Sequence, residues 1–181
     1  PVENINQKTL PLRSDKTANE KFITGTLSYG GRTYKTLIIN GKEWMAENLA
    51  YLPAVNPPAT GSYTEPRYYV YDFNGSDAAT ARQNTNYTAY GVLYNWPAAK
   101  AACPSGWHLP SDAEWTVLEN FLIASGYNFD GTTSGNKIAK SLAATTKWNS
   151  DSKSGSIGND LSLNNKTGFS ALPGGIRENN G

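Results

Sequence analysis

The sequence predicts an α+β fold with a β-hairpin near its N-terminal end, two helices in its middle and long irregular loops. Three observations lead to this prediction. An Asn-Gly pair separates two strand-like runs within residues 33–46, a helix-capping pattern precedes apolar residues at helical spacing after residue 110, and Gly, Ser, Asn and Thr dominate much of the rest. A length of 181 residues suits one domain with one hydrophobic core.

The predicted hairpin is formed by residues 33–39 and 42–46. The first run is rich in the β-branched and aromatic residues that favour strands, and the second carries Trp44. Asn40 and Gly41 lie between them, and both residue types tolerate the positive φ that a type I′ turn requires at its two central positions. We therefore expect two antiparallel strands joined by a two-residue turn.

Residues 1–28 mix Asn, Gln, Lys, Thr and Pro without a sustained hydrophobic period, so they are predicted to be a leader or linker. They add one strand at most, at residues 22–27. The domain itself is predicted to span residues 29–181. The first residues do not resemble a signal peptide, and we expect a mature or trimmed product. Prolines and polar turn residues make residues 53–90 a long irregular region, which is expected to contribute to any binding surface.

Two helices are predicted in the middle of the chain. The first covers residues 95–103, with Pro97 in its first turn, where a missing N–H does no harm. The second begins after Ser111, which can cap it while Glu114 completes a capping box, and it ends before Gly126. Its apolar residues recur at helical spacing and make one buried face; they are Trp115, Leu118, Phe121 and Leu122.

After Gly126 the chain returns to polar turn residues, broken by short apolar runs. A strand is expected at residues 107–109 and another near Phe169. The hairpin, the strand at residues 107–109 and the second helix each offer one apolar face, so we expect them to share one core. Its predicted members are Trp44, Trp107, Leu109, Trp115, Leu118 and Phe169.

Composition narrows the classes of function. Hydrophobic residues make up 38% of the chain, aromatic residues 12% and charged residues 17%, and the net charge is +1. This charge gives no long-range field to attract nucleic acid or an anionic membrane, so neither is expected as a partner. No apolar run reaches the roughly 18 residues of a membrane-spanning helix. A small aromatic core and an uncharged polar surface are expected, and such a surface is common in exported proteins.

Three segments of the chain resemble the Fibrobacter succinogenes major paralogous domain. They are residues 34–49, which end in WMAENL, residues 90–115, which contain YGVLYNW and CPSGWHLPSDAEW, and residues 168–175, GFSALPGG. The resemblance covers residues 29–181. Members are exported surface proteins, often lipoproteins, with a fold related to C-type lectins and formylglycine-generating enzymes. The resemblance thus implies a C-type-lectin-like mixed fold and an extracellular location, anchored to the outer membrane as a lipoprotein.

The family pattern continues past the Leu-Pro-Gly-Gly motif at residues 172–175 with further strands, the last of which carries a cysteine. By this comparison the C-terminal strands are missing. We therefore expect unpaired sheet edges and, as a partner, a complementary C-terminal fragment or a captured strand. The resemblance also implies that Cys103, the only cysteine, pairs with a cysteine of the final strand. The alternative is that Cys103 is a small buried hydrophobe.

The chemically active residue types do not favour catalysis. His108 is the only histidine, and it is interpreted as structural because no second histidine or cysteine cluster completes a metal site or supplies a catalytic partner. Cys103 lies at the C-terminal end of the first predicted helix, whose dipole opposes a thiolate. Formylglycine-generating enzymes use paired cysteines, which this chain lacks. The chain is therefore predicted not to be an enzyme.

Calcium is the cofactor that C-type-lectin-like folds often hold, through carboxylate and amide oxygens. No Asp-x-Asp-x-Asp run occurs, so the sequence places no metal site, and no other cofactor is predicted. The candidate carboxylates are Glu65, Asp72, Asp77, Asp151 and Asp160.

A group of tyrosines is the remaining signal, because flat aromatic faces stack on sugars and on partner proteins at low entropic cost. The predicted ligand-binding residues are Tyr68, Tyr69, Tyr71, Tyr87 and Tyr90, with Tyr63 and Tyr94 in the same group. The alternative is that these tyrosines build the core and form hydrogen bonds through their hydroxyls. The leading hypothesis is a non-catalytic surface binding or adhesion module for a glycan or a protein. A pilus-like display subunit and a divergent formylglycine-generating-type enzyme are the alternatives.

Overall fold

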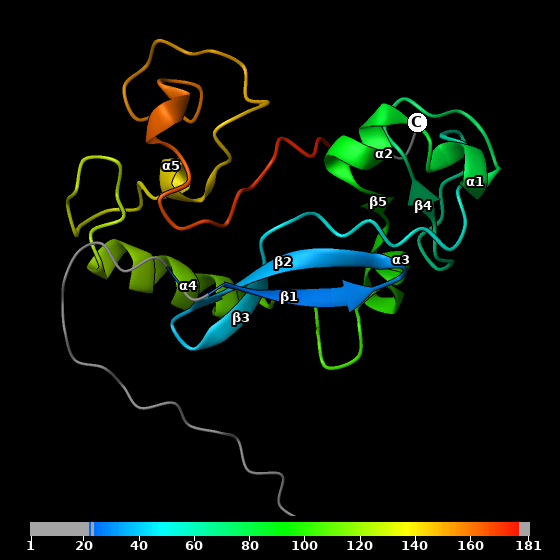
Figure 1. The fold of residues 1–181 in the computed structure, drawn as a ribbon, viewed down its shortest axis with the longest axis horizontal. Coiled ribbons are helices and arrows are strands. Elements are labelled where there is room, and N and C mark those ends of the chain that lie inside the picture. The colour runs from blue at the N-terminus through cyan, green and yellow to red at the C-terminus, as the bar shows by residue number, and fades with distance from the viewer. Residues whose placement is uncertain (1–21, 23, 178–181) are drawn as a thin grey trace, which may run out of the picture.

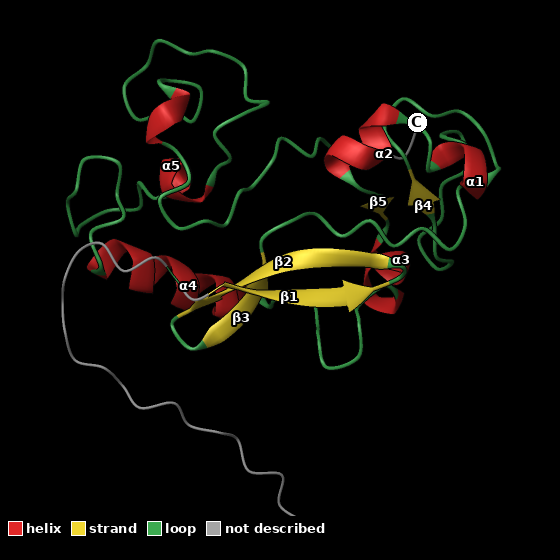
Figure 2. Cartoon of the chain, in the orientation of Figure 1, coloured by secondary structure: helices red, strands yellow, loops and turns green. Residues whose placement is uncertain are grey.

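The computed structural model describes residues 22 and 24–177, which form an α+β structure with an antiparallel three-stranded sheet at the N-terminal end (Figure 1, Figure 2). The predicted fold class is confirmed. In the described part of the chain, no helix is long and apolar enough to cross a membrane. In chain order the elements are β1 (Thr24–Tyr29), β2 (Arg32–Ile39), β3 (Lys42–Met45), β4 (Tyr68–Tyr69), α1 (Ala78–Ala81), α2 (Thr85–Tyr90), β5 (Leu93–Tyr94), α3 (Trp96–Ala101), α4 (Asp112–Ala124), α5 (Ala139–Leu142) and the 3₁₀ helix η1 (Leu161–Leu163).

The predicted hairpin is confirmed as β2 and β3. Their register runs from Thr36↔Met45 to Ile39↔Lys42, which leaves Asn40 and Gly41 as the two turn residues. Both have positive φ, 49° and 72°. This is the backbone conformation that a type I′ turn requires, and it explains why Asn-Gly stands here.

β1 adds a third strand to the hairpin and pairs with β2 along its whole length. It begins at Thr24, where the sequence predicted a strand over residues 22–27. Residues 24–28 therefore belong to the sheet, and the predicted domain boundary after residue 28 passes through a strand. The rest of the predicted leader, residues 1–21 and 23, lies outside the described residues.

Residues 53–90, predicted to be irregular, contain a short strand and two short helices. β4 pairs antiparallel with β5. α1 begins after Asp77 and α2 after Asn84, and each capping side chain accepts hydrogen bonds from N–H groups of the first turn. The prediction was wrong here because the polar residues that cap helices are the same ones that mark loops.

Both predicted helices are confirmed. α3 begins after Asn95, whose side chain accepts a hydrogen bond from its first turn, and Pro97 lies in that turn. α4 has the predicted capping box, in which Ser111 Oγ accepts from the Glu114 N–H while the Glu114 carboxylate accepts from the Ser111 N–H. It ends before Gly126, as predicted. Beyond these two, the described part contains the short helices α1, α2 and α5.

The strands predicted at residues 107–109 and near Phe169 are not formed. Residues 107–110 are a loop between α3 and α4. Near Phe169, a single parallel bridge joins Ala143 to Ala171. These predictions failed because a short apolar run does not distinguish a strand from a loop that packs against a core.

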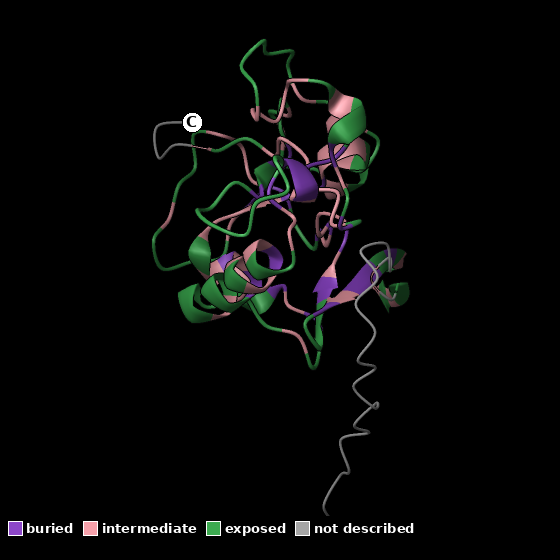
Figure 3. Ribbon diagram, turned by 90° about the vertical axis from the view of Figure 1, so that its left-hand side faces the viewer, coloured by how far each residue is buried: buried purple, intermediate pink, exposed green. Residues whose placement is uncertain are grey.

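The buried hydrophobic residues form two clusters instead of the one predicted core. Figure 3 marks the buried residues along the ribbon in purple. The first, here called the sheet cluster, joins β2 and β3 to α4. It contains Leu37, Ile39, Trp44, Ala46, Leu118, Leu122 and Ile138.

Three predicted core residues belong to the sheet cluster or pack against it, namely Trp44, Leu118 and Phe169. The Trp115 ring contacts the cluster from its rim and is 38% exposed. Trp107 and Leu109 lie outside the cluster, since the strand that was expected to carry them is a loop.

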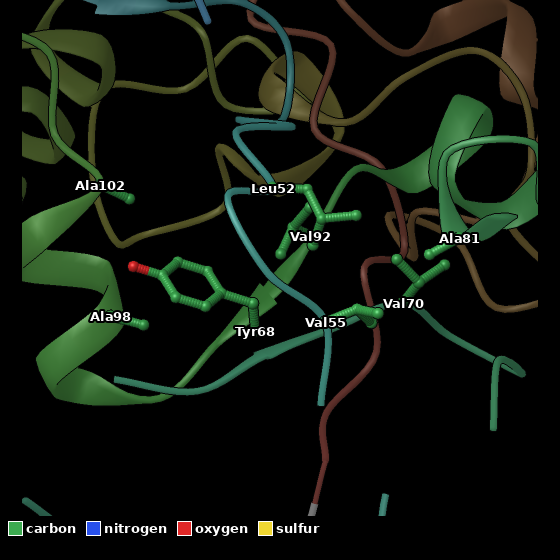
Figure 4. Close-up of a cluster of buried hydrophobic side chains, with 8 residues drawn as sticks. All are labelled: Leu52, Val55, Tyr68, Val70, Ala81, Val92, Ala98 and Ala102. Carbon is green, nitrogen blue, oxygen red and sulfur yellow. The ribbon is translucent and has the colours of Figure 1, made fainter. Parts of the chain in front are cut away.

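The second cluster, here called the β4 cluster, lies between β4, α1 and α3 (Figure 4). Figure 4 shows Tyr68 pointing toward Ala98 and Ala102 at α3. Its buried members are Leu52, Val55, Tyr68, Val70, Ala81, Val92, Ala98 and Ala102. The cluster thus mixes aliphatic residues and alanine with aromatic rings, since Tyr51, Phe73, Tyr87 and Tyr94 also pack against it.

Candidate binding site

A cleft of about 250 Å³ opens beside the end of the hairpin, at the N-terminus of α4. One wall is β3, the second is the loop before α4, and the third is the first turn of α4. The lining residues are Lys42, Glu43, Trp44, Gly106, Trp107, His108, Pro110 and Glu114. The cleft thus combines aromatic side chains with groups of both charges.

A smaller hollow of about 70 Å³ adjoins this cleft along the face of α4. It shares Lys42, Trp44 and Glu114 with the cleft. Its other lining residues are Ile39, Asn40, Val117 and Leu118. The two hollows together present an apolar recess beside a polar, aromatic cleft.

Glu114 organises the polar side of the cleft. Its carboxylate accepts hydrogen bonds from the Ser111 N–H at 2.9 Å and the Ser111 hydroxyl at 3.0 Å, and it lies 2.9 Å from His108 Nε2. These hydrogen bonds, that from the Ser111 N–H first, lower the pKa of Glu114 from 4.5 to about 2. Glu114 is therefore a fixed anion in the first turn of α4, where a negative charge is favourable.

His108, interpreted from the sequence as lacking a partner, pairs with Glu114. Its side chain is 68% exposed, so the ring stands at the mouth of the cleft. The sequence contained a signal for this pair. The predicted capping box places the Glu114 side chain beside Ser111, and Ser111 lies only three residues after His108. The sequence analysis missed it because the carboxylate was assigned only to capping.

Trp44 is 9% exposed and lines both hollows. Its ring centroid lies 4.9 Å from that of Trp115 on α4. The indole Nε1–H is buried, and it has no hydrogen-bond partner in the described part of the chain. An unpaired buried N–H is costly and uncommon, and this one is enclosed by protein atoms and not open to the cleft.

Cys103 lies at the end of α3 and is partly buried. Its thiol donates to the Ala99 carbonyl over 3.5 Å. Within the described residues no hydrogen bond joins Cys103 to His108. The sequence-based alternative was a small buried hydrophobe that closes a helix; Cys103 does lie at the end of α3 but is only partly buried, and the disulfide implied by the family resemblance stays a prediction.

Three of the five predicted ligand-binding tyrosines are committed to the interior. Tyr68 and Tyr69 are only 8% and 5% exposed. The Tyr69 hydroxyl donates to the Thr60 carbonyl at 2.6 Å, and the Tyr87 hydroxyl donates to the Ala50 carbonyl at 2.8 Å. Burial thus removes Tyr68 and Tyr69 from a stacking surface, and it favours the alternative that these rings build the core.

The remaining tyrosines do not form one exposed surface. Tyr94 donates to the Tyr51 carbonyl at 2.9 Å, and burial raises its pKa. Tyr71 is 58% exposed, Tyr63 is 85% exposed and Tyr90 is half-buried. A ligand role for Tyr71 and Tyr90 stays a prediction, and neither lines the cleft at Trp44.

The carboxylates considered for calcium are spread over the structure. Asp77 caps α1, Asp160 caps η1, and Asp151 accepts from the Lys153 N–H. Glu65 and Asp72 are exposed. Among the residues that the structure describes, no three His, Cys, Asp or Glu side chains come together as a group that could hold a metal ion.

Comparison with known families identifies the domain. The sequence model of the Fibrobacter succinogenes major domain (Fib_succ_major) matches residues 37–181. Comparisons with curated proteins and with solved structures gave no match. The C-type-lectin-like character implied by the resemblance therefore stays a prediction, while the α+β class is observed. Because the family match spans most of the chain, the protein belongs to the Fibrobacter succinogenes major domain family.

Proposed function

We propose that this chain is the non-catalytic binding module of an exported surface protein and that it binds its ligand in the cleft beside Trp44. The observation that carries the proposal is the cleft of about 250 Å³ itself, in which Trp107 and groups of both charges meet beside an adjoining apolar hollow.

The chemistry of the walls supports binding. Trp107 is half-buried and offers aromatic surface to the cleft, and the polar groups of Lys42, Glu43 and His108 can fix the orientation of a ligand. An apolar recess with a few convergent polar groups is the usual composition of a binding site. Both signs of charge are present, so the cleft suits a neutral or mixed-charge ligand, such as a glycan or a protein segment.

The arrangement of polar groups argues against catalysis. In a nucleophile–base–carboxylate series, the histidine bonds the nucleophile through one nitrogen and the carboxylate through the other. Here Ser111 and His108 both bond to the same carboxylate, that of Glu114. With a pKa of about 2, Glu114 is a weak general base at neutral pH. A formylglycine-generating-type reaction would need a second cysteine, and the sequence has one.

Export, surface attachment as a lipoprotein and a role in adhesion are part of the same proposal. They rest on what the family resemblance implies about the location of this chain and on a composition with only 17% charged residues. The location is tested independently of any ligand by asking whether cells of the source export the protein and whether a surface label then reaches it.

The binding proposal is tested by screening the purified domain against a glycan array and a displayed library of random peptides, followed by titration of the hits with tryptophan fluorescence. We expect hits from one of these classes, with affinity lowered about tenfold or more by Trp107→Ala, since truncated aromatic anchors typically cost at least about 1.4 kcal/mol. Trp96→Ala is the matched control, because Trp96 is 69% exposed on α3 and does not line the cleft. Absence of hits in both classes, or equal effects of the two variants, would overturn the proposal.

A further inference from the structure

We infer that the cleft binds a saccharide and that His108 selects it, by accepting a hydrogen bond from one ligand hydroxyl through Nδ1. The inference rests on the proposed function, because it uses the same cleft. It adds a class of ligand and a residue that determines specificity. Three features carry it, namely the fixed tautomer of His108, the open donors of Trp107 and Lys42, and a loop wall that is closed to a peptide backbone.

The Glu114 carboxylate fixes which nitrogen of the His108 ring carries the proton. His108 Nε2 lies 2.9 Å from one oxygen of this carboxylate and 3.0 Å from the other. Since the pKa of Glu114 is about 2, the carboxylate is ionised at neutral pH and its oxygens only accept hydrogen bonds. Nε2 is therefore the donor, and in the neutral imidazole Nδ1 keeps a lone pair and acts as an acceptor.

Ser111 holds the Glu114 carboxylate in this position. The Ser111 N–H and hydroxyl donate to one Glu114 oxygen at 2.9 and 3.0 Å, and the Glu114 N–H donates back to Ser111 Oγ. All these contacts lie within residues 108–114. The tautomer of His108 is thus set by the loop and the first turn of α4 alone, without contacts from the sheet.

The acceptor nitrogen of His108 is open to a ligand. The side chain is 68% exposed at the mouth of the cleft. Among the residues that the structure describes, the ring bonds only to Glu114, and it does so through Nε2. An acceptor needs a donor, so a ligand that fits the cleft has to bring a hydroxyl or an N–H to Nδ1.

Trp107 and Lys42 supply the complementary donors. Trp107 is half-buried and lines the cleft. Its Nε1–H has no hydrogen-bond partner in the described part of the chain and, unlike that of Trp44, it is not buried. Lys42 is exposed and lines both hollows, and its ammonium can only donate. The ligand thus needs acceptors for these two donors as well as a donor for His108.

A saccharide ring meets these requirements in one unit. Each hydroxyl is both a donor and an acceptor, so neighbouring hydroxyls can serve His108, Trp107 and Lys42 at once. The C–H face of the ring can lie against the half-buried indole of Trp107. The cleft also carries charges of both signs, from Lys42, Glu43 and Glu114, which suits an uncharged ligand.

The loop wall of the cleft is closed to the backbone of a peptide. The Trp107 N–H already donates to the Pro104 carbonyl at 2.9 Å. Pro110 has no N–H, and the Ser111 N–H is bonded to Glu114. An extended peptide is recognised largely through a run of free backbone groups, and these three positions interrupt any such run along the loop. A saccharide is therefore the ligand that this wall favours.

The tautomer is measured on the free protein by long-range proton–nitrogen NMR correlation in mildly alkaline solution, where an imidazole is neutral. His108 is the only histidine, so its ring signals need no assignment. We expect the proton on Nε2 in the wild type and a mixture of tautomers in Glu114→Gln, whose amide can donate or accept. A mixture in the wild type, or a proton on Nδ1, would overturn the inference and leave the proposed function standing.

The ligand contact is measured with the saccharides that the glycan array selects. Derivatives of each hit replace one hydroxyl at a time by fluorine, which cannot donate a hydrogen bond. At one position this change should weaken binding to the wild type about fivefold or more and leave binding to His108→Phe unaltered. Equal sensitivity of the two proteins at every position would contradict a hydrogen bond to Nδ1.

Two controls accompany this series. Leu109→Ala changes the next residue of the loop, which does not line the cleft, and it should bind the parent saccharide as the wild type does. His108→Phe should bind it about fivefold or more weakly, with a cooperative melting transition retained. If His108→Phe does not fold, the unchanged protein decides, because its Nδ1 resonance should shift toward the value of a protonated nitrogen in the complex; an unmoved resonance would overturn the inference.

The outcomes separate the inference from the proposed function. Peptide hits without glycan hits would overturn the saccharide and leave the binding module standing. Glycan hits whose affinity does not depend on His108 would do the same. Absence of hits of either class would remove both.

Discussion

Trp44 and Trp115 face each other across the junction of the hairpin and α4, with ring centroids 4.9 Å apart and planes inclined by 44°. The two rings are not equivalent, because Trp44 is 9% exposed and Trp115 is 38% exposed. Trp115→Ala is therefore expected to lower the free energy of unfolding by about 1 to 2 kcal/mol, less than the roughly 3 to 5 kcal/mol of a fully buried aromatic that the sequence pattern suggested. Urea unfolding measures this loss.

Leu118→Ala is the comparison for that experiment. Leu118 is 2% exposed in the sheet cluster, on the same helix as Trp115. Its truncation is expected to cost about 2 to 5 kcal/mol. A larger loss for Trp115→Ala than for Leu118→Ala would contradict the placement of Trp115 at the rim.

Acid stability should depend on Glu114. Its pKa falls from 4.5 to about 2 in the folded chain, chiefly through the hydrogen bond from the Ser111 N–H and then through His108. A carboxylate whose pKa is lowered by folding stabilises the fold at pH values above its pKa in the unfolded chain. This contribution is lost as the pH falls from about 4.5 toward 2. Glu114→Gln is expected to flatten the dependence of melting temperature on pH in that window.

Glu65→Gln is the matched control for Glu114→Gln. Glu65 is exposed, and among the described residues its carboxylate has no hydrogen bond. It should leave the acid limb of the stability curve unchanged. Equal steepness for the wild type and Glu114→Gln would show that the capping box does not hold the carboxylate in its charged form.

The parts of the fold that local chemistry determines were predictable from the sequence. Asn40 and Gly41 fix a two-residue turn, and Ser111 with Glu114 fixes the start of α4 within one residue. In both cases the pattern specifies backbone groups within a few positions. The family resemblance was equally readable, because it rests on long contiguous segments.

Features that depend on tertiary contacts were not predictable. Asp77 and Asn84 looked like loop residues until α1 and α2 placed N–H groups against them. The tyrosines looked like a binding surface, although carbonyl acceptors from distant loops draw several of them inward, as Ala50 does for Tyr87. The cleft requires β3, the loop after Gly106 and α4 to meet, and no local pattern encodes that meeting.

Gly91 should resist substitution for a steric reason as well as a conformational one. It ends α2 with φ 77° and ψ −136°. A Cβ at this position would lie 2.7 Å from the Leu49 carbonyl oxygen. Gly91→Ala is expected to cost about 1 to 3 kcal/mol in urea unfolding, since a strained backbone and a clash act together.

Gly168→Ala separates these two contributions. Gly168 has a similar φ of 83°, but a Cβ there would meet nothing within 4 Å. Its cost should therefore be the conformational part alone, smaller than that of Gly91→Ala. Equal losses for the two variants would mean that the contact with Leu49 relaxes freely.

Lys140 holds together the long turn-rich segment that follows α5. Lys140 is only 3% exposed. The ammonium donates to the carbonyls of Ser156 and Asp160, each at 3.2 Å, and to that of Asn159. One buried cation thus satisfies three carbonyl groups of a segment whose described residues contain only η1 as regular structure.

Lys140→Met keeps the length of the side chain but removes the donor, so buried carbonyl oxygens lose their partner. Loss of hydrogen bonds to a charged donor is expected to lower the free energy of unfolding by about 2 to 4 kcal/mol. The segment at residues 150–160 should also become a preferred cleavage site in limited proteolysis, because local opening no longer breaks these bonds. Lys100→Met, an exposed lysine in the last turn of α3, is the control and should match the wild type in both measurements. If Lys140→Met also matches the wild type, water or neighbouring donors replace the ammonium, and the segment is held by its other contacts, such as those that Asn164 makes with the Ala144 and Ile157 carbonyls.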